Sequence, residues 1–189
     1  MPGIIHFDSE QDVRNLLNAF RSRGYKDLDT ASNYPGSEAR LGQADAERQF
    51  TIHTKVHGWG NGDSKASKIE SSVEKSLADL KTSSVETMFL HVPDRQTPFE
   101  ETAKAMNDAY EQGKFNKWGI SNYTAAELQT FLDICETKGY VKPSVYEGHY
   151  NAIVRSGEKE LFPILRKHNM AFFAFRCAVQ LPELESNSD

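Results

Sequence analysis

The chain has 189 residues, of which 38% are hydrophobic and 26% are charged, proportions that are usual for a globular protein with one sizeable core. Its net charge of −5 comes from 22 basic and 27 acidic side chains, and no block rich in Lys and Arg stands out, which argues against nucleic-acid binding. Since the chain has neither an apolar run of about 18 residues nor a leader-like start, we expect a cytoplasmic protein without membrane contact.

Short apolar runs alternate with amphipathic stretches along the chain, a pattern typical of βαβ units around a parallel sheet. The predicted strands are Gly3–Phe7, Tyr25–Asp29, Phe50–Lys55, Val85–His91, Lys117–Ser121, Ser144–His149 and Ala171–Phe175. The predicted helices are Ser9–Ser22, Ser64–Leu80, Pro98–Gln112, Ala125–Lys138 and Gly157–Lys167. Units of about 30 residues fit both a (β/α) barrel and a doubly wound open sheet, so periodicity alone does not choose between them.

Local signals mark where several of these elements begin and end. The segment Thr124-Ala-Ala-Glu127 has the spacing of a capping box, and Gly24, Gly113 and Gly139 stand where helices should stop. The polar, acidic tail Pro182–Asp189 has no apolar period and is predicted to be disordered. The sequence therefore predicts a single domain over residues 1–181 and a tail over 182–189.

Four chemically useful side chains lie at or just after the ends of three successive predicted strands. Asp29, Lys55 and His91 end these strands, and Tyr34 follows Asp29 on a turn-rich loop. A phenol is a poor acid near neutral pH unless a cation stabilises its anion, and Lys55 is the candidate for that cation. A buried Lys55 needs a carboxylate such as Asp29 to stay charged, and His91 could orient a carbonyl oxygen.

The order and spacing of these residues resemble those of aldo-keto reductases, in which DTAxxY, a strand ending in TK and a strand ending in LH occur in sequence. The stretches FLHVPDRQTPFEET, EQGKFNKWGISNY and SVYEGHYNAIVRSGEKELFPILRKHNMAFFAF are similar to the aflatoxin-aldehyde reductase subfamily, which also reduces succinic semialdehyde. The resemblance implies an incomplete α/β barrel of the (β/α)8 TIM type. It also implies that Tyr34 is the proton donor, tuned by Lys55 and Asp29, while His91 positions a small-molecule carbonyl substrate.

The resemblance further implies NADPH as the cofactor. The family's Ser-Asn pair, which contacts the nicotinamide carboxamide, corresponds to Ser121 and Asn122. Its Tyr-Gln-Gly-x-Tyr-Asn stretch corresponds to Tyr146-Glu-Gly-His-Tyr-Asn151, so that Glu147 and Asn151 occupy cofactor-binding positions. An ionised Glu147 accepts hydrogen bonds but cannot donate one, as the family's glutamine can.

The sequence departs from the family pattern after Phe175. A loop around the pyrophosphate and a later group that holds the 2′-phosphate are expected there, but Arg176-Cys-Ala-Val-Gln-Leu-Pro182 follows instead. We therefore expect about seven β/α units, with the last strand and its helices missing. Two open sheet edges would then need partners, which favours a homo-oligomer.

Two alternatives to a reductase remain open. The acid and base residues could serve a cofactor-independent isomerase, dehydratase or cyclase, or the chain could be a non-catalytic remnant or regulatory subunit. A metal site is not predicted, because His53 and His57 lie about 13 Å apart along a strand. Cys135 and Cys177 match no metal-binding spacing and are predicted to be reduced thiols.

Overall fold

The computed structural model describes residues 9–178, and every structural statement below concerns that part of the chain. Helices and strands alternate along it. In chain order they are α1 (Glu10–Ser22), β1 (Asp27–Asp29), α2 (Ser37–Gln43), the 3-10 helix η1 (Ala46–Arg48), β2 (Thr51–Lys55), α3 (Ala66–Leu80), β3 (Val85–Leu90), α4 (Phe99–Glu111), β4 (Phe115–Ser121), α5 (Ala125–Lys138), β5 (Val145–His149), α6 (Gly157–Lys167) and β6 (Ala171–Phe175). The predicted strand Gly3–Phe7 and the predicted tail lie outside the described residues.

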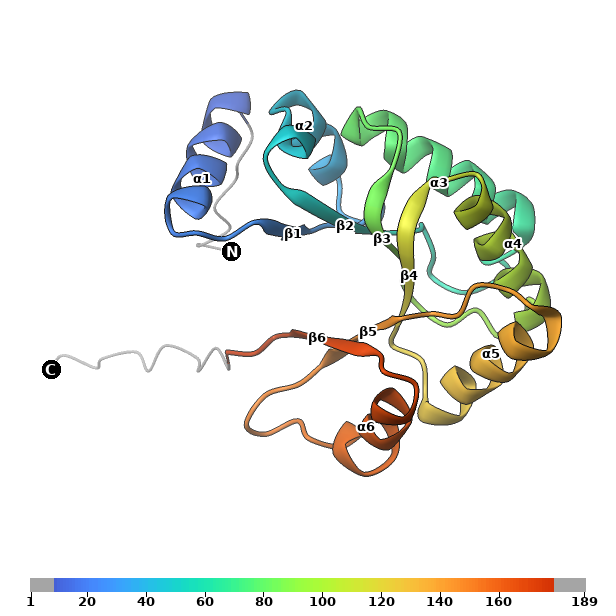
Figure 1. The fold of residues 1–189 in the computed structure, drawn as a ribbon. Coiled ribbons are helices and arrows are strands. Elements are labelled where there is room, and N and C mark those ends of the chain that lie inside the picture. The colour runs from blue at the N-terminus through green and yellow to red at the C-terminus, as the bar shows by residue number, and fades with distance from the viewer. Residues whose placement is uncertain (1–8, 179–189) are drawn as a thin grey trace, which may run out of the picture.

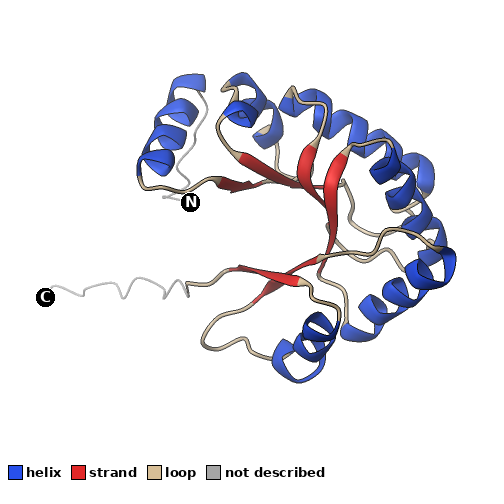
Figure 2. Cartoon of the chain, in the orientation of Figure 1, coloured by secondary structure: helices blue, strands red, loops and turns tan. Residues whose placement is uncertain are grey.

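The sheet has six strands in the order β1-β2-β3-β4-β5-β6, and every neighbouring pair is parallel. A doubly wound sheet reverses its strand order at a switch point and carries helices on both faces. Here the order never reverses, and the helices lie on the convex side of a curved sheet (Figures 1 and 2). The prediction of an incomplete (β/α) barrel is confirmed, and the open-sheet alternative is wrong.

Contacts across the concave face show how strongly the sheet curves. The rings of His53 on β2 and Phe173 on β6 meet edge to face, with centroids 5.2 Å apart. In a flat sheet, strands four positions apart would be separated by about 19 Å. The Phe89 ring on β3 also packs against Phe173, at 6.1 Å. The interior of the arc is therefore partly filled by side chains from strands that are not neighbours.

The local signals in the sequence explain several element boundaries. Thr124 accepts a hydrogen bond from the Glu127 backbone N–H, and the Glu127 carboxylate accepts one from the Thr124 N–H, which confirms the capping box. Gly139 ends α5 with a left-handed φ of 70°, which costs glycine little. The short helices α2 and η1 were not predicted, because their apolar residues are too few to show a period.

The main core lies between the sheet and its helices. Trp118 on β4 and Phe131 on α5 are fully buried and pack edge to face. Gly119, the next residue of β4, faces the opposite, concave side of the sheet. A Cβ at this position would lie 2.4 Å from the Phe89 ring. Glycine is therefore needed at this position for the aromatic side chains of the concave face to fit.

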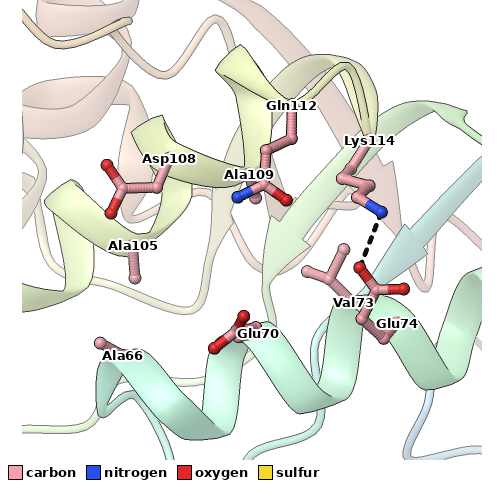
Figure 3. A pocket seen from close by; sticks show the side chains of 9 residues that line it. All are labelled: Ala66, Glu70, Val73, Glu74, Ala105, Asp108, Ala109, Gln112 and Lys114. Carbon is pink, nitrogen blue, oxygen red and sulfur yellow. Dashed lines mark ion pairs between the residues drawn. The ribbon is translucent and has the colours of Figure 1, made fainter.

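A small cavity of about 120 Å³ opens on the helical layer, between α3 and α4. Glu70 and Glu74 come from α3 and Asp108 from α4, while Lys114 precedes β4 and pairs with Glu74 at 2.7 Å (Figure 3). None of the predicted site residues lines this cavity. None of the described helices is long and apolar enough to cross a membrane.

Candidate functional site

A larger cavity of about 570 Å³ lies at the carboxyl ends of the strands, where parallel α/β folds place their sites. Asp29 is the last residue of β1, and His91 directly follows β3. Tyr34 lies in the turn after β1, where its N–H donates to the Ala31 carbonyl. The residues that line the cavity are Asp29, Tyr34, His91, Ser121, Asn122, Glu147, His149, Phe175 and Arg176.

Lys55, the last residue of β2, is fully buried beside this cavity. Its Nζ donates hydrogen bonds to Asp29 Oδ1 at 2.5 Å and to the Thr30 carbonyl at 3.0 Å. Glu147 Oε2 lies 3.2 Å from the same Nζ, on the side of β5. A buried ammonium is tolerated only with such partners, and here two carboxylates surround one cation.

Tyr34 is exposed at 44%, and the Asp29 side chain is exposed to a similar extent. Its ring stands edge-on to the His91 ring, with centroids 5.7 Å apart, and its centroid lies 5.8 Å from Lys55 Nζ. Burial raises the pKa of the Tyr34 phenol; Lys55 opposes that change, whereas Asp29 and Glu147 add to it, so that the net direction is upward. The cation alone does not make this phenol a stronger acid.

His91 is held as a neutral imidazole. Burial lowers its pKa to about 4, and the positive charge of Lys55 and the nearby His57 act in the same direction. Its Nδ1 is buried and has no hydrogen-bond partner among the described residues. A neutral imidazole carries one N–H, which can be donated to the oxygen of a bound carbonyl group.

Glu147 on β5 is buried against the inner end of the cavity. Burial raises the pKa of its carboxyl group to about 7, and the negative charge of Asp29 adds to the effect while Lys55 opposes it. Despite its closeness to Lys55 Nζ, Oε2 receives no hydrogen bond of good geometry from the described residues. This carboxyl group can therefore change charge near neutral pH.

The structure brings three of the four predicted cofactor-binding residues to the cavity. Ser121 ends β4, and Asn122 follows it with a left-handed φ of 67°. The Asn122 amide donates to the His91 carbonyl at 2.9 Å and to Ser121 Oγ at 3.0 Å. Asn151 does not line the cavity: its amide donates to the Arg176 carbonyl, and its Oδ1 accepts backbone N–H groups of its own loop.

Sequence reasoning did not assign two further lining residues, His149 and Phe175, whose rings stack with centroids 5.4 Å apart. A signal for His149 was present, because it lies two residues after Glu147 and alternate residues of a strand share a face. Phe175 gave no such signal, because an apolar residue at the end of a strand more often belongs to the hydrophobic core than to a binding site. Arg176, which has a left-handed φ of 53°, is the one lining side chain with a permanent positive charge.

The fold is a partial α/β barrel with a cavity at the carboxyl ends of its strands. A model described as the aldo/keto reductase family matches residues 5–178. The chain therefore belongs to the aldo/keto reductase family, which confirms the resemblance seen in its motifs.

Curated relatives give the same result at moderate identity. The chain is 36% identical over 166 residues to aflatoxin B1 aldehyde reductase member 2 of Homo sapiens, covering 84% of this chain and 46% of the relative. It is 37% identical over 169 residues to human aldo-keto reductase family 7 member A3, covering 85% and 50%. It is also 34% identical over 172 residues to aldo-keto reductase pigE of Monascus ruber, covering 85% and 50%. The chain thus spans about half the length of these relatives.

The cavity suits the nicotinamide end of a nicotinamide dinucleotide better than it suits the phosphates. Ser121 and Asn122 present polar groups at the cavity, and His91 Nδ1 is a buried polar atom that lacks a protein partner. These features suit a polar ring and a carbonyl group. The phosphates need cations or glycine-rich backbone at a helix N-terminus, and Arg176 is the candidate that the cavity offers.

Proposed function

We propose that the protein reduces an aldehyde or ketone to an alcohol with NADPH, with Tyr34 as the proton donor. The observation that carries this proposal is the convergence of Asp29, Tyr34, Lys55 and His91 on one cavity. The names of curated relatives point to aldehydes as the substrate class.

Each residue has a role that follows from its surroundings. The neutral His91 would donate its N–H to the substrate oxygen and hold it beside the edge-on Tyr34 ring. NADPH, when bound, supplies the hydride. Tyr34 would give its proton to the oxygen as negative charge develops there, and the Lys55–Asp29 pair would stabilise the phenolate that remains. Ser121 and Asn122 would hold the nicotinamide.

The test is NADPH oxidation by the purified chain with nitrobenzaldehyde as the substrate. Absorbance measures the NADPH consumed, and product analysis measures the alcohol formed. We expect the alcohol to form in equal amount to the NADPH consumed. Tyr34→Phe should lower the rate about 100-fold or more, because it removes the donated proton. Tyr110→Phe, which changes an exposed tyrosine on α4, is the matched control. NADPH binding is measured separately by quenching of the protein fluorescence. The proposal fails if no binding is detected at high micromolar NADPH.

The position of Glu147 favours a second candidate, proton transfer without a cofactor. Its carboxyl group titrates about neutral pH and lines the same cavity as Tyr34 and His91. The ionised carboxylate would take a proton from the carbon next to a carbonyl group while Tyr34 protonates the carbonyl oxygen, which gives an enediol. Glu147 would then return a proton to the former carbonyl carbon as the other enediol hydroxyl gives its proton back to Tyr34, and exchange of the Glu147 proton with D2O between the two steps introduces deuterium. Dihydroxyacetone in D2O without NADPH tests this activity by NMR. Deuterium uptake that is lost in Glu147→Gln supports it, and the absence of uptake excludes it for this substrate.

A further inference from the structure

The ammonium group of Lys55 has three N–H donors, and two of them are already committed. One goes to Asp29 Oδ1 at 2.5 Å and one to the Thr30 carbonyl at 3.0 Å. The other groups near Nζ are the apolar Phe89 ring, with its centroid at 5.5 Å, and two groups that could accept the third N–H. Glu147 Oε2 lies 3.2 Å from Nζ, and the Tyr34 ring centroid lies 5.8 Å from it.

The two candidates differ in what they gain from this N–H. Glu147 Oε2 is a buried carboxylate oxygen without a hydrogen bond among the described residues, and such an oxygen is costly to leave unpaired. The Tyr34 side chain is exposed at 44%, so that water can satisfy its hydroxyl group. An ionised Glu147 is therefore the stronger competitor for the third N–H.

The charges around Glu147 come from several elements. Asp29 on β1 and Lys55 on β2 are its nearest charged neighbours, and the cavity also contains Tyr34, His91, His149 and Arg176. With Glu147 ionised, two carboxylates share one ammonium, and the excess negative charge opposes formation of a Tyr34 phenolate. With Glu147 protonated, Lys55 and Asp29 balance each other, and the third N–H is released.

We propose that Glu147 is a positioning residue that competes with the Tyr34 phenol for the third N–H of Lys55, so that its ionisation withdraws Lys55 from Tyr34. The Lys55–Asp29–Glu147 cluster thereby sets the acid strength of Tyr34 according to the proton on Glu147. Its consequence for turnover rests on the proposed function, whereas the competition itself does not.

The sign of the expected pH dependence follows from the direction in which Glu147 is perturbed. Because burial raises its pKa to about 7, the carboxyl group is largely protonated below that pH and ionised above it. Carbonyl reduction should therefore slow as the pH rises through about 7. A substitution that keeps position 147 neutral should remove this step from the pH profile.

The direct experiment is a pH titration of the full chain carrying 13Cζ-labelled tyrosine, followed by NMR. The Tyr34 signal is assigned as the one that disappears in Tyr34→Phe. Glu147→Gln removes the charge but keeps an acceptor, whereas Glu147→Met removes both at similar size. We expect the acid dissociation constant of Tyr34 to rise about tenfold in Glu147→Gln, as for the loss of one nearby like charge. It should rise further in Glu147→Met, where nothing competes for the N–H.

The matched control is Glu86→Gln, which changes another strand carboxylate paired with a lysine, Lys117, but outside the cavity. It should leave the Tyr34 titration unchanged. The inference would be overturned if the Tyr34 pKa were the same in the wild type and in both Glu147 variants. It would also be overturned if Glu86→Gln shifted the Tyr34 pKa as much as Glu147→Gln does. The titration needs no turnover. A Tyr34 shift without NADPH oxidation would therefore refute the proposed function and leave the competition standing.

Discussion

The rings of His53 on β2 and Phe173 on β6 touch across the concave face, with centroids 5.2 Å apart, although three strands lie between them in the sheet. The same curvature brings Glu147 Oε2 on β5 to 3.2 Å from Lys55 Nζ on β2, where a flat sheet would separate the two strands by about 14 Å. Strand pairing between β1 and β2 places Asp29 beside Lys55, and the barrel curvature adds Glu147 to complete the charged cluster.

Phe173→Ala should destabilise the protein, because it removes the ring that packs on both His53 and Phe89. We expect a loss of about 2 kcal/mol in the free energy of unfolding, less than for a fully buried phenylalanine. Urea denaturation followed by circular dichroism measures it. Ile153→Ala, at a position that is 76% exposed, is the control and should change stability little. An equal effect of both variants would contradict this account of the concave face.

Acid should destabilise the protein through His91. Its folded-state pKa is lowered to about 4 from an ordinary 6.5, so the stability linked to its neutral form is present above about 6.5. That stability is lost as the pH falls towards 4, and amounts to about 3 kcal/mol at most. His91→Gln should flatten this part of the stability profile, measured as unfolding free energy against pH. A profile of unchanged slope between these values would rule out a buried neutral His91.

Glu147 should have the opposite effect at higher pH. Its folded-state pKa is raised to about 7 from 4.5, so its stabilising effect is complete below 4.5 and is lost as the pH rises through 7. Between pH 4 and pH 8, the stability of Glu147→Gln relative to the wild type should therefore rise by about 3 kcal/mol at most. Thermal melts in matched buffers at the two pH values test this. An unchanged difference would show that the carboxyl group keeps an ordinary pKa.

The edges of the described sheet lead to a prediction about assembly. β1 and β6 end the strand order, and β6 carries three phenylalanines in five residues. Within residues 9–178 each of these two strands has one edge without a partner strand, and since such edges favour association, we expect a second copy of the chain to pair with them. Light scattering after size-exclusion chromatography should give a dimer whose proportion falls in Ala174→Lys, which places a charge on β6. A monomer at all micromolar concentrations would contradict the predicted homo-oligomer.

Apart from the short helices α2 and η1, the sequence by itself determined the order of helices and strands in residues 9–178 and the carboxyl ends of the strands to within a residue, because hydrophobic period and capping residues act over a few neighbouring positions. It therefore indicated Asp29, Tyr34, Lys55 and His91 as residues at one end of the sheet. Family resemblance added Ser121, Asn122, Glu147 and Asn151.

Periodicity left the barrel and the open sheet undecided and the family resemblance favoured the barrel, but only the tertiary structure showed that Glu147 faces Lys55 from across the curved sheet. It also directed the Asn151 side chain into its own loop and placed His149 and Phe175 at the cavity. These relationships depend on the summed twist of several strands and on aromatic packing over the concave face. Such contacts join residues that are distant in sequence, such as Lys55 and Glu147, and no local period in the sequence records them.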